Sequence, residues 1–428
     1  MTSLRRTTFC LAALALCAAC APAQALSLRA AATAALHHDP RFDQTEAEID
    51  LARAGESVAR ATDGLSLGFA ADIGRSDLRT DAPFPQSGVR TPNSLALAAS
   101  QPLYNGGRAS ALEEASRRAV EAALEKRREV GGKIILATLT AYLDLKRDRE
   151  TARLSEVNRD TLEQARADAD KRLQAGEATR TDLALANARL AEAVANVERS
   201  KAQLRASEIA LTRLIGPLPA DLDAAWPEFI ATAASREQAI AESHSAPAVL
   251  SAQHSGRAAQ SQIRVAEAER LPKLSLDARA GTQDNSDFGY DRLSTWALQL
   301  KLQVPILTGG MVKARVSEAS ARASSARYAA ADTEAYYAET AAREWELLSA
   351  SGPVIAAFQS QVQAADLALD GVRKELKVGS RTTLDLLDAE RDLLSAQVNL
   401  VGARRDRAVT AFRLLAACGK LELENVPD

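Results

Sequence analysis

Two short segments of the chain combine a glycine, a threonine and an aspartate at the same spacing. The two sets are Gly176, Thr179 and Asp182, and Gly379, Thr382 and Asp385. A glycine suits the left-handed conformation that ends many helices. A threonine followed three residues later by an acid can exchange hydrogen bonds with the backbone that begins the next helix, and the acid also complements the helix dipole. Each segment therefore predicts a tight turn between two helices that carries a carboxylate.

The other residue types with catalytic or metal-binding chemistry form no such pattern. The four histidines are an adjacent pair and two residues ten apart, without an acid or thiol at metal-ligand spacing: His37, His38, His244 and His254. Gly106-Gly107 and Gly309-Gly310 lack the downstream glycine or lysine of a phosphate loop, so we interpret them as strand-to-helix turns. No nucleophile–base arrangement is visible. We expect no enzyme activity, no metal and no cofactor.

The chain repeats itself at an offset of 203 residues. The recurring positions are Pro102, Gly106 and Gly107 as Pro305, Gly309 and Gly310; Gly176, Thr179 and Asp182 as Gly379, Thr382 and Asp385; and Gly216 as Gly419. Because three separate landmarks share one offset, we expect each half to be one structural unit used twice.

The first 25 residues resemble a secretory signal peptide. Arg5 and Arg6 precede an apolar run at residues 9–19, and Ala23-Gln24-Ala25 is a typical cleavage site. The apolar run is too short to span a bilayer as a helix. The sequence therefore predicts an exported protein.

Cysteine usage and net charge further narrow the class of protein that the sequence can represent. Three of the four cysteines lie in the predicted signal peptide, so Cys418 alone remains and no intramolecular disulfide is expected. Lipidation at Cys20 is an alternative to cleavage, although the leucine expected three residues earlier is missing. The 56 acidic and 53 basic residues give a net charge of −3, which is not typical of nucleic-acid binding.

Long runs of Ala, Leu, Glu, Arg, Lys and Gln predict unusually long helices. Residues 107–175 can form one helix on the order of 100 Å long at ~1.5 Å per residue, and residues 181–214 return with an apolar seam. Residues 310–378 and 384–415 repeat this plan. Such lengths are typical of coiled coils. Because proline removes a hydrogen bond and clashes with the preceding turn, we expect a kink or a helix junction at Gly352-Pro353.

Two segments before each long helix alternate apolar and polar residues, as strands with one apolar face do. They lie at residues 65–74 and 94–103 and at residues 274–281 and 294–306. Strands of about 9–11 residues span a bilayer when tilted. Four strands do not close a barrel, since known single-chain barrels start at about 8 strands, but three chains supply twelve. A small soluble sheet with one wet face is the alternative.

With these features in place, the chain resembles the TolC family of outer-membrane channel proteins. The resemblance is carried by residues 101–108 (QPLYNGGR), 172–182 (RLQAGEATRTD) and 378–390 (VGSRTTLDLLDAE), and it extends from about Ala30 to Gly419. It implies a mainly α protein with membrane β-strands, a homotrimer whose 12-stranded β-barrel continues as a periplasmic α-helical barrel. It also implies an exit duct for type I protein secretion or drug efflux. The implied partners are a periplasmic adaptor and an inner-membrane transporter, most often of the ABC type, with the RND type possible.

The resemblance also implies roles for individual residues. Asp385 and Asp388 match acidic residues that line the periplasmic entrance, and three chains would create a ring of six carboxylates. Arg381 and Asp182 match an arginine and an aspartate that hold the entrance closed. Leu376 departs from the family's pattern, which has a gate tyrosine there. The residues expected to dock an adaptor are Gly176, Glu177, Thr179, Gly379, Ser380 and Thr382.

The predicted layout follows the repeat. It comprises a signal peptide at 1–25, a first repeat at 26–216 with its turn at 173–179, a linker at 217–243, a second repeat at 244–420 with its turn at 376–382, and a tail at 421–428. The rival classes are a periplasmic coiled-coil adaptor or scaffold, which needs no membrane strands, and an exported enzyme, for which no site is visible. The sequence favours an exit duct located in the outer membrane.

Overall fold

A computed structural model of the chain describes residues 26–79, 88–219, 222–223, 226–227, 233–285 and 291–427. The predicted signal peptide lies outside these residues. The chain divides into two compact units. We call the described parts of Met1–Asp43, Arg128–Ala246 and Glu334–Asp428 the helical unit, and those of Gln44–Arg127 and Pro247–Thr333 the sheet unit.

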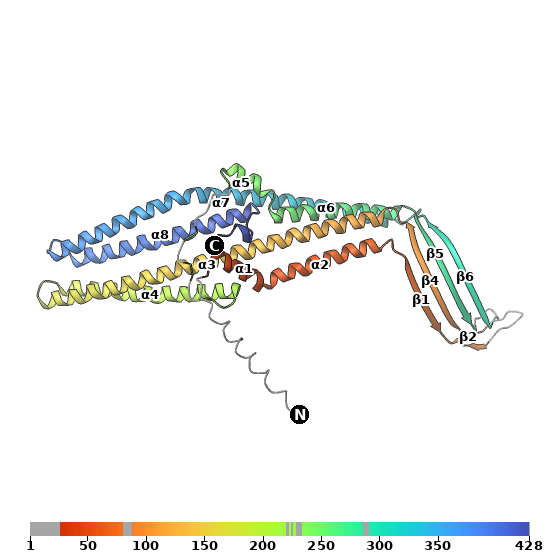
Figure 1. The fold of residues 1–428 in the computed structure, drawn as a ribbon, viewed down its shortest axis with the longest axis horizontal. Coiled ribbons are helices and arrows are strands. Elements are labelled where there is room, and N and C mark those ends of the chain that lie inside the picture. Colours follow the sequence, from red (N-terminus) through yellow and green to blue (C-terminus); the bar gives the residue numbers. More distant parts are fainter. Residues whose placement is uncertain are drawn as a thin grey trace, which may run out of the picture. The chain divides into compact units, whose positions relative to one another are not determined.

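Each half of the chain contributes two main strands followed by a helical hairpin (Figure 1). The elements are α1 Leu28–His38, α2 Pro40–Ala61, β1 Ser66–Ile73, β2 Ser76–Leu78, β3 Gly88–Arg90, β4 Asn93–Tyr104, α3 Arg108–Gln174, α4 Arg180–Ile215, α5 Arg236–Ser243, α6 Pro247–Glu267, a 3-10 turn Ala268–Arg270, β5 Lys273–Asp284, β6 Arg292–Gln303, α7 Met311–Lys377, α8 Thr383–Ala417 and a 3-10 turn Leu423–Asn425. Helices α3 and α7 are each 67 residues long.

The sheet unit holds a four-stranded antiparallel sheet in the order β1-β4-β5-β6, so the strand pairs of the two repeats join through β4 and β5. One face is apolar, since a row of opposed residues consists of Phe69, Leu97, Ala280 and Trp296. The other face is polar, with Ser66, Ser100, Asp277 and Gln299 in one row. The alternation predicted from the sequence is therefore present.

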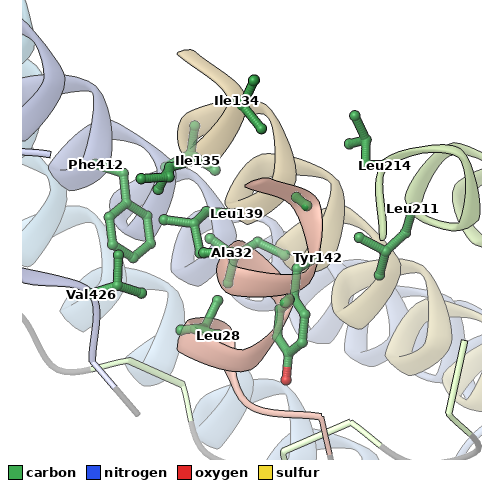
Figure 2. Packing of buried hydrophobic residues seen from close by; sticks show 14 of the residues in the cluster. Leu28, Ala32, Ile134, Ile135, Leu139, Tyr142, Leu211, Leu214, Phe412 and Val426 are labelled. Carbon is green, nitrogen blue, oxygen red and sulfur yellow. The ribbon is translucent and has the colours of Figure 1, made fainter. Parts of the chain in front are cut away.

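The main core of the helical unit gathers residues from both repeats. Figure 2 shows Leu28 and Ala32 of α1, Leu139 and Tyr142 of α3, and Phe412 of α8 packed together. Leu211 and Leu214 of α4 and Val426 near the C-terminus belong to the same buried cluster. Because Tyr142 is 1% exposed, its hydroxyl needs partners: it donates to Leu26 O at 2.7 Å and accepts from Asp223 N at 3.0 Å.

The sequence predicted a kink or a helix junction at Gly352-Pro353. There is no junction, because α7 continues as one helix through Pro353. Buried or half-buried residues anchor α7 on both sides of the proline, Trp345 and Leu348 before it and Leu369 after it, so one lost hydrogen bond does not end the helix. The polar loop after β1 also contains two short paired strands, β2 and β3, which the sequence pattern did not predict.

Within the described ranges, every helix falls short of the combined length and hydropathy that a bilayer-crossing helix needs.

Candidate functional site

The turn between α3 and α4 closes with two sets of local hydrogen bonds. Gly176 has φ +76°, and the amides of Gly176 and Glu177 donate to Leu173 O at 3.1 Å and Arg172 O at 2.8 Å. These bonds satisfy carbonyls at the end of α3 in a Schellman motif. At the start of α4, the Asp182 amide donates to the Thr179 hydroxyl at 3.1 Å, and the Thr179 amide donates to Asp182 Oδ2 at 2.9 Å. The predicted capping box is confirmed.

The turn between α7 and α8 repeats this arrangement. Gly379 has φ +79°, and the Ser380 amide donates to Glu375 O at 3.0 Å. The Asp385 amide donates to the Thr382 hydroxyl at 3.2 Å, and the Thr382 amide donates to Asp385 Oδ2 at 2.8 Å. We call these two turns, residues 173–182 and 376–388, the first and second tip. Both tips lie at one end of the helical unit (Figure 1).

The capping hydrogen bonds favour the ionised form of the two tip carboxylates. The bonds from the Thr179 amide and hydroxyl hold the pKa of Asp182 below its ordinary value of 3.8. The bonds from Thr382 do the same for the pKa of Asp385. Both carboxylates therefore stay charged down to a lower pH than a free aspartate does.

Arg381 lies within the second tip and contacts acids of its own hairpin. Its Nε donates to Glu375 Oε2 at 2.9 Å, and its Nη1 lies 3.9 Å from Asp385 Oδ1. Among the described residues of a single chain, Arg381 makes no ion pair with Asp182. The Asp182 carboxylate accepts a hydrogen bond from the Thr179 hydroxyl instead. A pair between Arg381 and Asp182 thus stays a prediction.

Asp388 makes a contact between the two hairpins that the sequence did not predict. Arg189 of α4 donates from Nη2 to Asp388 Oδ1 of α8 at 3.2 Å. Arg391, one turn further along α8, places Nη1 3.7 Å from the same oxygen. Beside this pair, Leu387 is 1% exposed and packs with Ala186 and Leu190 of α4. The two hairpins are therefore joined near the tips by an ion pair and a small apolar core.

The residues expected to dock an adaptor lie on the surface. Gly176, Glu177 and Thr179 are exposed in the first tip, and Gly379, Ser380 and Thr382 in the second. Val378, beside Gly379, is 80% exposed. Both turns are held by backbone hydrogen bonds and by the capping boxes, and these six residues leave their surfaces exposed.

The described parts of the chain contain no group of three or more histidine, cysteine, aspartate or glutamate residues placed to hold a metal ion. His244 and His254 each contact one carboxylate, of Glu334 at 2.7 Å and of Glu121 at 2.8 Å. The notable features are thus the charged tips and the two-faced sheet. Apolar side chains on one sheet face are strongly exposed, with Trp296 at 83% and Phe69 at 69%. Exposure of this extent marks a surface that contacts protein or lipid.

Comparison with known proteins fits these features. A family model described as "Outer membrane efflux protein" matches residues 31–217 and 237–420. The outer membrane efflux protein BepC of Brucella suis is 31% identical over 348 residues, covering 80% of this chain and 75% of BepC. The alkaline protease secretion protein AprF of Pseudomonas aeruginosa is 26% identical over 407 residues, covering 91% of this chain and 83% of AprF. The crystal structure of the outer membrane protein VceC of Vibrio cholerae has a TM-score of 0.81 at 22% identity, covering 92% of this chain and 96% of VceC.

The chain belongs to the outer membrane efflux protein family, which confirms the resemblance to TolC-like channels. It is an outer-membrane exit channel of an export system, with its helical part in the periplasm. The coiled-coil adaptor considered as a rival is not favoured, because the relatives are channel proteins.

Proposed function

We propose that three copies of the chain assemble so that their sheets close one barrel of twelve strands. The observation that carries this proposal is the edge of the sheet: among the described strands, β1 pairs only with β4 and β6 only with β5. A sheet with an apolar face cannot leave such edges open in lipid, because unpaired backbone groups cost several kcal/mol each. Three sheets joined edge to edge remove every edge, and the polar face lines the lumen.

The mass of the purified protein in detergent and its single-channel conductance in a planar bilayer test this assembly. A trimeric mass together with discrete conductance steps supports it. A monomer or dimer without channel activity contradicts it.

In this assembly the tips form the periplasmic entrance. Three copies of Asp385 and Asp388 make a ring of carboxylates that favours cations. Support comes from their position in the second tip, where the Asp385 side chain is 37% exposed and the Asp388 side chain is 40% exposed. Arg381 and Asp182 complete the gate, with Arg381 pairing with Asp182 across hairpins of the assembled trimer.

The exposed tip residues dock a periplasmic adaptor. Gly176, Glu177 and Thr179 of the first tip and Gly379, Ser380 and Thr382 of the second provide this surface in each chain. In this proposal, an inner-membrane transporter of the ABC type delivers the cargo to the channel. Cysteine crosslinking from Glu177 and Ser380 to the adaptor in cells tests the contact, and an absence of crosslinks from both positions contradicts it.

As the first candidate, the channel exports a protein. AprF, whose name refers to alkaline protease secretion, matches this chain over 91% of its length. Efflux of small molecules is the second candidate, because BepC is named an efflux protein and is 31% identical. Deleting the gene and comparing secreted proteins with drug susceptibility separates the two. Loss of a secreted protein with unchanged susceptibility supports secretion, and the reverse supports efflux.

A further inference from the structure

We propose that Arg189 is both a latch of the entrance and a mask for the charge of Asp388, so that opening the entrance also increases its selectivity for cations. This inference rests on the proposed function, and specifically on the placement of the tips at the entrance. It assigns a role to a residue of α4 that neither tip motif contains.

The latch follows from where the contact lies. The bond from Arg189 Nη2 to Asp388 Oδ1, at 3.2 Å, joins the hairpin of the first repeat to that of the second. The Arg189 side chain is 29% exposed and Asp388 is 40% exposed, so water screens the pair only in part. An opening movement that draws α8 away from α4 must break this bond and expose Leu387, now 1% exposed.

A second contact shows which part of α8 stays in place. Arg405 Nε lies 2.8 Å from Asp144 Oδ1 of α3, about 25 Å from Asp388 along α8 at ~1.5 Å per residue. The Arg405 side chain is only 17% exposed, and Phe412 of the main core follows it. The α8 helix is thus held by the main core and a half-buried pair far from the tip, and by the more exposed Arg189–Asp388 pair and Leu387 close to it. A long lever held at one end moves most at the other, where Arg189 acts.

The mask follows from the charges around Asp388. Two guanidinium groups face its carboxylate, those of Arg189 at 3.2 Å and Arg391 at 3.7 Å. Arg391 lies on α8 and moves with Asp388, whereas Arg189 lies on α4 and stays behind. Separation therefore removes one cation from each carboxylate, and the three Asp388 side chains of a trimer gain effective negative charge. Coulomb attraction for permeating cations rises accordingly.

The experiment compares Arg189→Gln with Asp388→Asn in single-channel recordings of the full-length protein. Both variants break the latch, so both should increase the open-to-closed ratio, by about tenfold for three weakened pairs. Their effects on selectivity have opposite signs. Arg189→Gln unmasks Asp388 and raises the potassium-to-chloride permeability ratio, whereas Asp388→Asn removes the charge and lowers it. If Arg189 acted in helix packing alone, the two variants would change gating without shifting the permeability ratio in opposite directions.

Two further variants complete the test. Arg199→Gln is the matched control, because Arg199 also lies on α4 but bonds only to Asn196 of its own helix, at 2.9 Å. The exchange variant Arg189→Asp with Asp388→Arg restores the pair and should restore the closed state, and it remains informative if a single variant assembles poorly. The inference is overturned if Arg189→Gln behaves like Arg199→Gln, or if both single variants shift selectivity in the same direction. A wild-type protein that forms no channel contradicts the proposed function instead.

Discussion

Arg405 of α8 and Asp144 of α3 form a half-buried ion pair between the two helical hairpins, with 2.8 Å between Nε and Oδ1. The side chains are 17% and 27% exposed, and Nη1 of Arg405 also contacts Asp406 at 2.9 Å. Asp406 is 70% exposed, so the two acids around one guanidinium lie in very different surroundings. This difference provides a matched pair of substitutions.

Asp144→Asn should destabilise the protein by about 1–2 kcal/mol, because it removes the more buried of the two carboxylates that neutralise a largely desolvated guanidinium. Asp406→Asn should change stability by less than about 0.5 kcal/mol, since its carboxylate is hydrated. Thermal unfolding followed by helical circular dichroism compares the two. Equal losses would mean that burial does not set the strength of this contact.

Gly106 and Gly309 are counterparts in the two repeats, and only one of them is crowded. Both have positive φ, +71° and +59°, where an alanine costs roughly 1 kcal/mol. A Cβ on Gly106 would lie 2.7 Å from the Leu271 Cβ and 2.8 Å from Ala268 O, whereas a Cβ on Gly309 meets no atom within 4 Å. Gly106→Ala should therefore reduce the yield of folded protein in the outer membrane more than Gly309→Ala. A similar yield for both variants would contradict this difference.

The capping boxes should make a measurable contribution to the order of the tips. Thr179→Ala and Thr382→Ala should each destabilise the start of their helix by about 1 kcal/mol and speed hydrogen exchange of the tip amides severalfold. Thr161→Ala is the control, because its hydroxyl bonds back to Val157 O within α3 at 3.0 Å and caps no helix. Exchange of the tip amides that is unchanged in both cap variants would show that the turns are held by the glycine motifs alone.

Acidification should loosen the tips through the same carboxylates. The pKa values of Asp182 and Asp385 are lowered from 3.8 by bonds that exist only in the folded turn. A lowered pKa means that the stabilisation is fully present above the unfolded value and is lost as pH falls through the folded one. Tip amide protection factors should therefore fall below about pH 4 in the wild type, and Asp182→Asn should abolish this pH dependence at the first tip. Protection that persists well below that pH would contradict the role of the carboxylates.

The acidic ring predicts a loss of selectivity when it is neutralised. Asp385→Ala combined with Asp388→Ala should weaken cation selectivity in a planar bilayer, and unchanged selectivity would exclude the ring.

Arg381→Ser should raise conductance by loosening the second tip, where Arg381 contacts Glu375 at 2.9 Å. Unaltered conductance would count against a gate role for Arg381.

Features with a local cause were predicted well from the sequence. The helices, the alternation of the strands and the two capping boxes depend on residues that are neighbours in the chain. Gly131 and Gly132 are poor helix formers, yet α3 continues through both. The ring of Phe42 lies against Gly131, where a Cβ would approach it to 3.3 Å, so the glycine makes room for packing.

The contact between Arg189 and Asp388 could not be predicted in this way. The two residues lie 199 positions apart and meet only because α4 packs on α8. The repeat offers no guide, because at its offset the counterpart of Arg189 is Asp392 and that of Asp388 is Leu185. The contact therefore exists once in the chain and has no equivalent pair at the repeated positions.

Cys418 has a practical consequence for all of these experiments. It is the only cysteine of the described chain, it is 1% exposed, and burial raises the pKa of its thiol to about 11. A buried thiol that stays protonated at neutral pH reacts slowly with maleimides or disulfide reagents. The described part of the chain therefore presents an unreactive background for labelling. A cysteine introduced at either tip becomes the one reactive thiol among the described residues, where it can carry a spin label or a fluorophore.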